Sequence, residues 1–198
     1  MIRLIHHSLN NKGDKIMNAI FIKKYLACVA DIMEQEKELL ITLDSVVGDG
    51  DLGLTMSDGF AAASLAIKDS EESDCGKLLY AAGKAMSIAV PSTMGTLMAS
   101  GLMAAGKALK GKQELENCDV LHIFTAYEEG VIQRGKARVG DKTFLDGFHP
   151  GIIALKEAIS TQSLKEAANV AYIASMKGYE ATVGMLAVHG RAATRGEK

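Results

Sequence analysis

Apolar side chains recur at spacings of three and four residues along most of this 198-residue chain, which is the period of an amphipathic α-helix. The clearest stripe consists of Phe21, Tyr25, Leu26, Val29, Ile32 and Met33. It predicts a helix over about residues 18–40. No alternating run of β-branched residues competes with this pattern, so we expect the chain to be all-α.

The same period predicts further helices over residues 54–68, 75–89, 94–110, 120–134, 144–159 and 164–188. Asp74 and Asp119 stand at N-cap positions of two of them. Ser163 does the same for a third, and together with Glu166 it predicts a capping box.

Small residues shape the expected packing of these helices. Aromatic residues make up only 5% of the chain, tryptophan is absent, and alanine and glycine recur inside the helical segments. Small side chains let helix axes approach closely. The sequence therefore predicts a single all-α bundle with its functional groups on the connecting loops.

Charge and cysteine content exclude several classes of protein. The formal net charge is −2 and the isoelectric point is near 6.2, which gives no reason to expect nucleic acid or an anionic membrane as a partner. No run of about 18 apolar residues predicts a membrane span. Cys28, Cys75 and Cys118 lack metal-ligand spacing, so we expect reduced thiols in a cytoplasmic protein.

The first residues differ from the rest of the chain. Residues 1–17 precede the first strong helical pattern and lack the apolar stretch that a secretory signal needs. Two interpretations stay open for them, a disordered N-terminal extension or a wrongly assigned start, and we expect residues 18–198 to form the folded domain. No repeat, low-complexity tract or linker divides that domain.

The most informative loop follows the first predicted helix, where Asp44, Asp49 and Asp51 are interspersed with glycines. Carboxylate oxygens suit Mg²⁺, which prefers octahedral oxygen coordination, and glycines let the backbone direct several side chains at one point. An alternative is that Asp51 only caps the next helix. An EF-hand calcium loop is excluded, because Leu54 and Phe60 stand where that loop needs glycine and glutamate.

A second loop, over residues 90–96, places proline, hydroxyl side chains and a glycine at the start of a small-residue helix. Backbone N–H groups at a helix N-terminus favour an anion. The hydroxyl groups of Ser92, Thr93 and Thr96 add possible donors for phosphate oxygens. The alternative is a well-capped helix with proline near its start.

A third loop, over residues 135–146, is basic and contains glycines. It is similar to a Walker A loop, but Asp141 separates Gly140 from Lys142 and no strand precedes it, so a P-loop is rejected. A functional loop and a solvated turn between helices are both open interpretations of this segment.

The histidines carry less information than these loops. His122 and His149 have no metal-ligand partners at helical spacing, so we expect structural or surface roles for them. His189 lies next to the Gly190–Arg191 pair, and both a structural and a functional role stay open for it.

In order and spacing, the three loops together resemble the nucleotide-binding L subunit of bacterial dihydroxyacetone kinase. The resemblance extends from about residue 18 to the end of the chain, and its strongest motif is the acidic loop. The loop over residues 135–146 comes next, followed by Gly-Arg-Ala-Ala-Thr-Arg-Gly-Glu over residues 190–197. Each motif is modest alone, and their joint order carries the resemblance.

The resemblance implies a closed barrel of about seven to eight antiparallel amphipathic helices, with ADP or ATP bound at one end. Asp44, Asp49 and Asp51 would hold two Mg²⁺ ions that bridge the nucleotide phosphates. The implied nucleotide contacts are Ser92, Thr93, Gly95, Leu97, Gly140, Thr143, Phe144 and Arg191. No residue is an obvious nucleophile, so the expected mechanism depends on metal ions and positioning.

Roles within this set also follow from the resemblance. Ser92 and Thr93 would lie under the phosphates, with Gly95 allowing close approach. Thr143 would reach a phosphate or the nucleotide edge, and Arg191 would contact a phosphate. Leu97 and Phe144 would line the adenine pocket.

The resemblance also implies partners. In the family a separate K subunit binds the ketose, and in many bacteria a phosphocarrier subunit of the sugar phosphotransferase system rephosphorylates the bound ADP. We therefore expect a phosphotransferase that acts only with its partner subunit, and a homodimer is kept as an open alternative. Two other functions stay open: an ATP-binding domain with another acceptor subunit, as in related fatty-acid kinases, and a nucleotide-dependent regulator.

Some residues depart from the family pattern. Leu52 stands where histidine usually follows the third aspartate, and residues 91–95 replace a Gly-Gly-x-Ser-Gly type loop. The chain also ends before the family's Asp-Pro-Gly-Ala stretch and last helix, so we expect either that the sequence is shortened or that part of the nucleotide lid and barrel wall is missing. These departures indicate a divergent paralogue, so dihydroxyacetone and another short sugar such as a tetrulose both stay open as its ketose.

Overall fold

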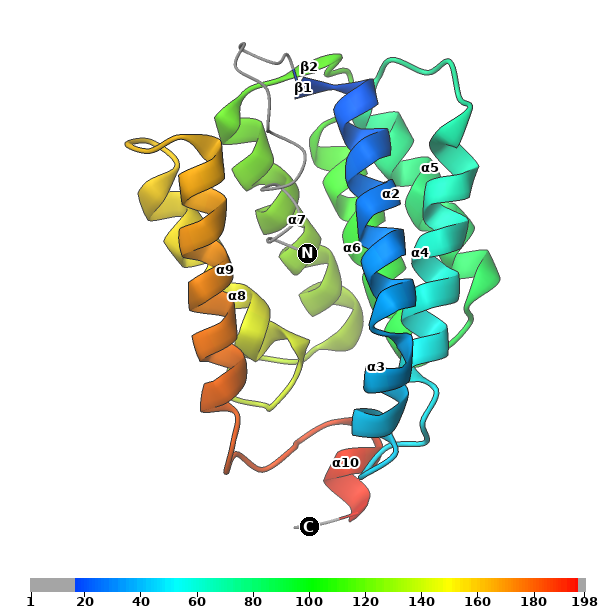
Figure 1. The fold of residues 1–198 in the computed structure, drawn as a ribbon, viewed down its shortest axis with the longest axis vertical. Coiled ribbons are helices and arrows are strands. Elements are labelled where there is room, and N and C mark those ends of the chain that lie inside the picture. The colour runs from blue at the N-terminus through cyan, green and yellow to red at the C-terminus, as the bar shows by residue number, and fades with distance from the viewer. Residues whose placement is uncertain (1–16, 196–198) are drawn as a thin grey trace. The chain divides into compact units, whose positions relative to one another are not determined.

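The structure, a computed structural model, describes residues 17–195. Its helices, in chain order, are α2 (Ala19–Gln35), α3 (Lys37–Asp44), α4 (Leu52–Lys68), α5 (Cys75–Ala89), α6 (Thr93–Ala108), α7 (Asn117–Gly135), α8 (Phe144–Ala158), α9 (Leu164–Ala181) and α10 (Gly190–Arg195) (Figure 1). The expected all-α class is confirmed, whereas a closed barrel stays a prediction.

Two short strands accompany the helices. Strand β1 (Met17–Asn18) pairs antiparallel with β2 (Glu114–Leu115), with Met17 opposite Leu115. Met17 is buried, so it belongs to the folded part of the chain and not to the extension in which we placed it. The rest of that expected extension lies outside the described residues.

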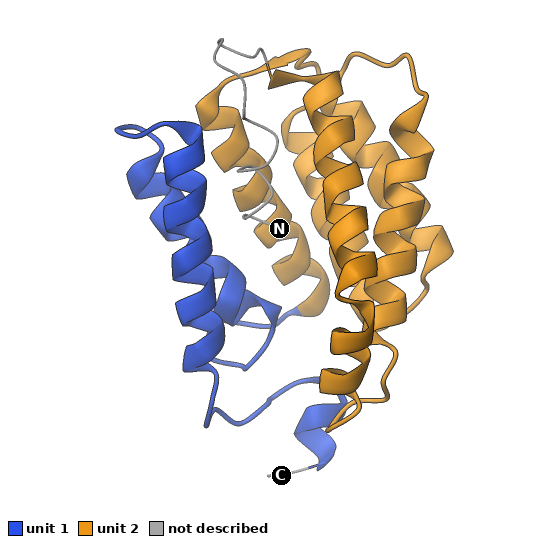
Figure 2. Cartoon of the chain, in the orientation of Figure 1, with its two compact units in different colours: residues 1–13, 136–198 blue, residues 14–135 orange. Residues whose placement is uncertain are grey.

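The chain divides into two compact units (Figure 2). Unit 2 contains β1 through α7, and unit 1 contains α8 through α10. The acidic loop and the 90–96 loop therefore belong to unit 2, whereas the 136–143 loop and the 190–195 helix belong to unit 1.

Close helix packing characterises unit 2. Helix α4 packs against α2 and α5, and α6 packs against α5 and α7. A Cβ atom on Gly106 would lie 2.5 Å from the backbone N of Tyr80, and one on Gly130 would lie 2.6 Å from the backbone O of Ser100. These glycines let α5, α6 and α7 approach backbone to backbone, as the alanine and glycine content predicted.

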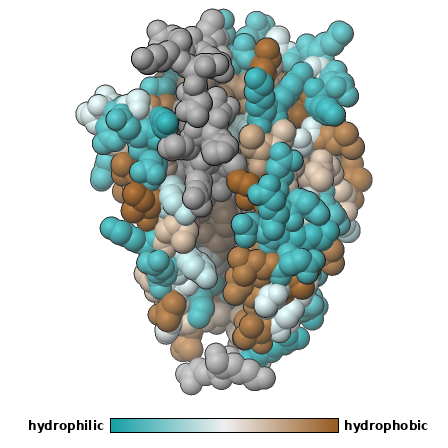
Figure 3. Space-filling view, in the orientation of Figure 1, coloured by the Kyte–Doolittle hydropathy of each residue, from teal (hydrophilic) through white to brown (hydrophobic). Residues whose placement is uncertain are grey.

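Apolar side chains fill the interior and also reach the surface. Phe60, Leu78 and Met98 are buried in unit 2, and Leu155 and Ala171 are buried where α8 packs on α9 in unit 1. Brown atoms in Figure 3 show that apolar side chains also remain exposed on the face drawn there. Among the described helices, none has both the length and the apolar character needed to cross a bilayer.

The first predicted helix is in fact two helices. Glu36 leaves helical geometry, with φ −92° and ψ 4°, so α2 ends at Gln35 and α3 begins at Lys37. A one-residue break hardly changes the apolar period, and neither glycine nor proline marks it, which is why the sequence predicted a continuous helix. The physical reason for the break is tertiary: α3 turns to pack on the first turn of α4.

Two other expectations were also wrong. Helix α9 ends at Ala181 instead of continuing to residue 188, because Thr182 is its C-cap and Gly184 has a positive φ of 84°. Asp119 is not an N-cap residue but lies within the first turn of α7, where it is buried and accepts hydrogen bonds from the Lys112 ammonium and the Glu116 backbone. By contrast, Asp74 and the Ser163–Glu166 box cap their helices as predicted.

Candidate metal and phosphate site

The three aspartates of the acidic loop converge. Asp44 is the last residue of α3, and Asp49 and Asp51 lie in the loop that leads into α4. One carboxylate oxygen from each residue lies within 4.8 Å of the others. Three like charges at such distances repel one another, and a bound cation relieves that repulsion.

Asp44 organises the loop. Its Oδ2 atom accepts hydrogen bonds from the backbone N–H groups of Gly50 (2.8 Å), Asp51 (3.1 Å) and Leu52 (3.4 Å). The carboxylate therefore compensates the N–H groups at the start of α4, as a capping residue would. Asp44 thus closes the loop while presenting its carboxylate to the cluster.

Two glycines make this loop possible. A Cβ atom on Gly48 would lie 2.0 Å from Asp44 Oδ1, so no larger residue fits without moving the Asp44 carboxylate. Gly50 has a φ of 77°, which side chains of L-residues seldom adopt. The position of the Asp44 carboxylate therefore requires Gly48, and the backbone conformation of the loop requires Gly50.

A third glycine brings α3 onto α4. A Cβ atom on Gly53 would lie 2.2 Å from the backbone O of Lys37. This contact explains why α3 is separate from α2: its first residue packs directly on the first turn of α4. The packing places Asp44 at the end of α3 beside the start of α4.

Asp51 occupies the N-cap position of α4, but its side chain makes no capping hydrogen bond. Its carboxylate is exposed, as is that of Asp49. The alternative in which Asp51 serves only as a cap is therefore not what the structure shows. The local charge of Asp51 is directed into the cluster with Asp44 and Asp49.

The donor set fits Mg²⁺. Two oxygen ligands of one Mg²⁺ lie about 3 to 4 Å apart, because each Mg–O distance is about 2.1 Å. Oxygens within 4.8 Å of one another need only small adjustments to share one ion, or to flank two ions about 4 Å apart. Asp44, Asp49 and Asp51 are thus the residues that would hold the metal.

A hydroxyl group connects the acidic loop to the start of α6. Thr55, in the first turn of α4, donates its backbone N–H to the Asp51 carbonyl (2.9 Å) and its hydroxyl to Ser92 Oγ (3.1 Å). Thr55 is buried, at 6% exposure. Thr55 was not predicted from the sequence, although a hydroxyl four positions after Asp51 is a signal that could have indicated it. The contact brings the acidic and 90–96 loops together within unit 2.

Ser92 is the N-cap of α6, and its Oγ accepts a hydrogen bond from the Gly95 N–H (3.0 Å). The capping alternative for Ser92 is therefore observed, while the neighbouring Thr93 is exposed at the helix start. A Cβ atom on Gly95 would lie 2.4 Å from the Val90 carbonyl, so the turn itself requires this glycine. The first turn of α6 joins backbone N–H groups and a hydroxyl, a combination that suits phosphate.

Leu97, the expected adenine contact of unit 2, lies one turn further along α6. It is half-buried, and a Cβ atom on Gly135 would lie 2.9 Å from its Cδ2 atom. Gly135 is the last residue of α7, so Leu97 packs against the end of that helix.

In unit 1, Asp146 organises the loop over residues 136–143, which we call the glycine loop. Its Oδ1 atom accepts a hydrogen bond from the Gly140 N–H (2.6 Å), and its Oδ2 atom accepts one from the Thr143 N–H (2.7 Å). Asp146 is buried, at 4% exposure. It forms a capping box with Thr143 at the start of α8. Asp146 stood in the sequence motif, but its anchoring role was not predicted.

The glycine loop holds an unusual backbone conformation. Lys136 and Lys142 have φ values of 60° and 57°, and Gly140 has a φ of 101°. Non-glycine residues seldom adopt positive φ, and such positions persist where surrounding contacts fix them. Phe144, which follows the loop, stacks on Phe148 with ring centroids 4.7 Å apart. Gly140, Thr143 and Phe144 are thus fixed in one turn of unit 1.

The segment over residues 182–195, which we call the C-terminal segment, is bound to the glycine loop. His189 Nε2 lies 2.8 Å from Asp141 Oδ2, and the Val188 N–H donates to the Asp141 carbonyl (3.2 Å). The Arg138 N–H and then the His189 side chain hold the pKa of Asp141 below its ordinary value. Arg191 lies two residues beyond His189, in α10.

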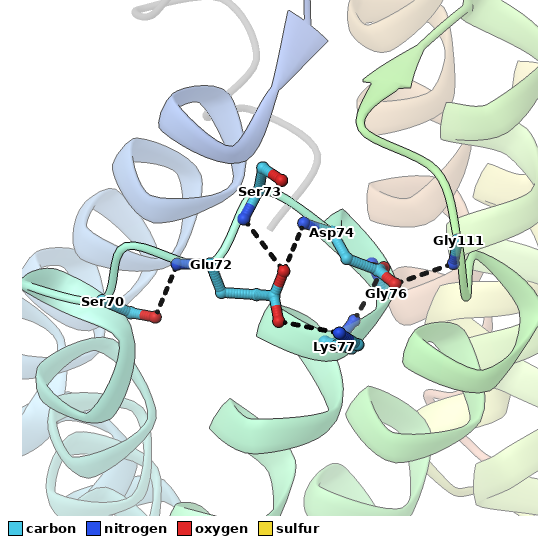
Figure 4. Close-up of polar contacts among 7 residues, drawn as sticks. All are labelled: Ser70, Glu72, Ser73, Asp74, Gly76, Lys77 and Gly111. Atoms are coloured by element: carbon cyan, nitrogen blue, oxygen red, sulfur yellow. Dashed lines mark hydrogen bonds and ion pairs between the residues drawn. The ribbon is translucent and has the colours of Figure 1, made fainter.

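A second acidic loop, over residues 70–77, differs from the metal candidate (Figure 4). The Glu72 carboxylate accepts hydrogen bonds from the backbone N–H groups of Ser73 and Asp74, both at 3.0 Å, and forms an ion pair with the Lys77 ammonium (3.0 Å). Asp74 caps α5 and accepts the Gly111 N–H (2.9 Å). Protein donors thus surround the carboxylates of this loop, which makes it a structural element.

Comparisons with known proteins agree with these features. A profile described as the DAK2 domain matches residues 46–198. The chain is 30% identical over 178 residues to the protein of Escherichia coli K12 named "PEP-dependent dihydroxyacetone kinase, ADP-binding subunit DhaL", which covers 89% of this chain and 85% of that protein. It is 29% identical over 188 residues to the corresponding subunit of kinase 2 of Listeria innocua, covering 94% of this chain and 87% of the relative.

A longer relative also matches. The L-erythrulose kinase of Pectobacterium atrosepticum is 31% identical over 194 residues, which cover 92% of this chain but only 33% of that enzyme. The matched region is thus a subunit of its own in some relatives and part of a longer kinase chain in another.

Proposed function

The chain belongs to the DAK2 domain family, and from this premise we propose that it binds ADP or ATP with Mg²⁺ and acts as the phosphotransferase subunit of a short-chain ketose kinase. The observation that carries the proposal is the convergence of Asp44, Asp49 and Asp51 beside the start of α6. Relatives named as ADP-binding subunits support the nucleotide, and the oxygen-only donor set supports Mg²⁺.

Unit 2 would bind the phosphates. Bound Mg²⁺ would neutralise phosphate charge and align the phosphoryl group for transfer. Asp44, held by the backbone at the start of α4, would keep its carboxylate in place as ligands exchange. Thr93 and the N–H groups at the start of α6 would donate to phosphate oxygens, while Thr55 fixes Ser92.

Unit 1 would supply further nucleotide contacts. Gly140 and Thr143 lie on a loop fixed by Asp146, and Phe144 offers an aromatic face for the adenine. Arg191, in the segment bound to this loop, would contact a phosphate as a cation. In unit 2, we propose Leu97 as a further apolar contact of the adenine.

The acceptor and donor are also part of the proposal. We place the ketose on a separate K subunit, because the described residues offer metal and phosphate ligands but no recognisable sugar site. Relatives named for dihydroxyacetone and for erythrulose suggest a ketose of three or four carbons. The names of the PEP-dependent relatives suggest a phosphocarrier donor, and the three free cysteines accord with a cytoplasmic location.

The test is a reconstituted kinase assay. The purified chain is mixed with Mg-ATP and either dihydroxyacetone or erythrulose, with and without a K subunit, and ketose phosphate is measured. We expect product only when the K subunit is present, because the acceptor hydroxyl must be brought in line with the terminal phosphoryl group. A second series replaces ATP with a phosphocarrier and catalytic ADP. Appreciable product from this chain alone, or none from any combination, would contradict the proposal.

A further inference from the structure

Asp141 and Lys142 of the glycine loop both contact the C-terminal segment. His189 Nε2 lies 2.8 Å from the Asp141 carboxylate, and the Val188 N–H donates to the Asp141 carbonyl (3.2 Å). The Lys142 ammonium donates to the Met185 carbonyl (3.0 Å). Asp141 therefore offers both a side-chain and a backbone acceptor to the same segment.

Asp141 is itself fixed by the glycine loop. Its Oδ2 atom accepts the Arg138 N–H (2.8 Å), and the neighbouring Gly140 N–H donates to the buried Asp146. Lys142, the next residue, has a positive φ of 57°. The glycine loop thus presents a prearranged acceptor to the C-terminal segment.

The C-terminal segment needs such a contact to be placed. Helix α10 has only six residues, and none of them is buried. Apolar burial therefore contributes little to its position, which depends on polar contacts. The His189 side chain reaches the Asp141 carboxylate of the glycine loop, and His189 precedes Arg191 by two residues.

We propose that His189 is a positioning residue for nucleotide binding: its hydrogen bond to Asp141 holds Arg191 at a fixed place relative to Gly140 and Thr143. This inference rests on the proposed function, because it assigns His189 an effect on phosphates through Arg191. His189 does not touch the ligand in this account. Its effect is to reduce the conformational freedom that Arg191 loses when a polyphosphate binds.

The first experiment measures Mg-ADP affinity of His189→Phe and His189→Gln by calorimetry. Phenylalanine keeps an aromatic ring but removes the donor, whereas glutamine keeps an N–H donor near the position of Nε2 without the ring. We expect about five- to tenfold weaker binding for His189→Phe and less than about twofold change for His189→Gln. Equal loss in both variants, or no loss in His189→Phe, would overturn the proposal.

The second experiment tests whether His189 acts through Arg191. In an Arg191→Ala background, His189→Phe should cause no further loss of affinity, since the residue that it positions is gone. An unchanged five- to tenfold loss in that background would show a direct or general effect and would overturn the inference. His122→Phe is the matched control, because His122 also lies near an aspartate, Asp119 (3.8 Å), and it should leave affinity unchanged.

The third experiment separates this inference from the proposed function. Hydrogen exchange of the nucleotide-free protein reports the Val188 N–H, and its exchange should be faster in His189→Phe than in the wild type or His189→Gln. Unchanged exchange would overturn the positioning role whatever the ligand. If the wild-type protein binds no Mg-nucleotide, the proposed function fails, and the effect of His189 on phosphate binding fails with it. Faster Val188 exchange in His189→Phe would then still show that the His189–Asp141 hydrogen bond holds the C-terminal segment.

Discussion

Two acidic loops of unit 2 stand before helices but have different chemistry. In the loop over residues 70–77, backbone N–H groups and an ammonium group surround the carboxylates of Glu72 and Asp74. In the loop over residues 44–51, Asp44 accepts backbone N–H groups, yet Asp51 occupies an N-cap position without capping and lies close to the other carboxylates. The first loop stabilises its own fold, whereas the second concentrates negative charge that a cation can neutralise.

The pKa values of the structural loop reflect this difference. The Asp74 N–H and the Lys77 side chain hold the pKa of Glu72 below its ordinary value. Burial opposes the ionisation of Asp74, but the N–H groups of Gly111, Lys77 and Gly76 together hold its pKa below its ordinary value. Such a carboxylate contributes to folding stability, and it needs no ligand.

The largest expected effect is on Mg-ADP affinity when Asp51 of the acidic loop is replaced. Asp51→Asn should weaken Mg-ADP binding by at least about 100-fold, or about 2.7 kcal/mol, because a metal ligand loses its charge. The free energy of unfolding should stay unchanged or rise slightly, since repulsion within the cluster is relieved. Calorimetry and thermal denaturation measure the two quantities.

The matched variant for Asp51→Asn is Asp74→Asn in the other loop. It should leave Mg-ADP affinity unchanged. If Asp51→Asn instead unfolds the protein and leaves affinity intact, the acidic loop is a capping element and the contrast between the loops disappears.

The next effect concerns glycines. Gly48→Ala places a methyl group where it would lie 2.0 Å from Asp44 Oδ1, so the carboxylate must move and Mg-ADP affinity should fall about tenfold. Gly111→Ala meets no atom within 4 Å but has a φ of 92°, so it should lower stability by about 1 kcal/mol and leave affinity unchanged. Calorimetric titration with Mg-ADP and thermal denaturation compare the two variants. An equal loss of Mg-ADP affinity in both would contradict the account.

A smaller effect is expected for the cap itself. Asp74→Ala removes the acceptor for the Gly76, Lys77 and Gly111 N–H groups and should lower the free energy of unfolding by about 1 to 2 kcal/mol. Urea denaturation measures this change. Ser73→Ala serves as a control, because the Ser73 contact to Glu72 uses its backbone N–H and not its side chain.

The smallest effect is a pH dependence. Folding lowers the pKa of Asp74. The stability that its ionised carboxylate contributes is therefore fully present above the pKa of the unfolded state, about 4, and is lost as the pH falls through the lower pKa of the folded state. The stability difference between wild type and Asp74→Asn should therefore shrink as the pH falls below about 4. Denaturation at a series of pH values tests this, and a difference that grows on acidification would contradict the sign.

Local signals allowed much of the fold to be predicted. Helix starts at Asp74 and Ser163 depend on hydrogen bonds within four residues, so the sequence contains all the partners. The break at Glu36 depends instead on α3 packing against Gly53, a contact between separate helices that no local pattern records. Asp119 failed as a predicted cap for a similar reason, because its partner Lys112 belongs to the preceding loop.

The candidate site shows the same division. The acidic motif indicated the convergence of its three aspartates, because they lie close in sequence and glycines separate them. Thr55 and Asp146 were missed, since their roles are to fix Ser92 and Gly140 through contacts that spacing alone does not reveal. The pairing of His189 with Asp141 joins residues 48 positions apart and was likewise left open.

The central claim is that Asp44, Asp49 and Asp51 bind nucleotide through a divalent cation, and calorimetric titration of ADP into the wild-type protein tests it most directly. One titration contains Mg²⁺ and the other an excess of chelator, at the same ionic strength. The account predicts binding with Mg²⁺ and a loss of at least about 100-fold in affinity with chelator, because three carboxylates repel an unmetallated polyphosphate. Equal affinity in the two titrations would contradict it.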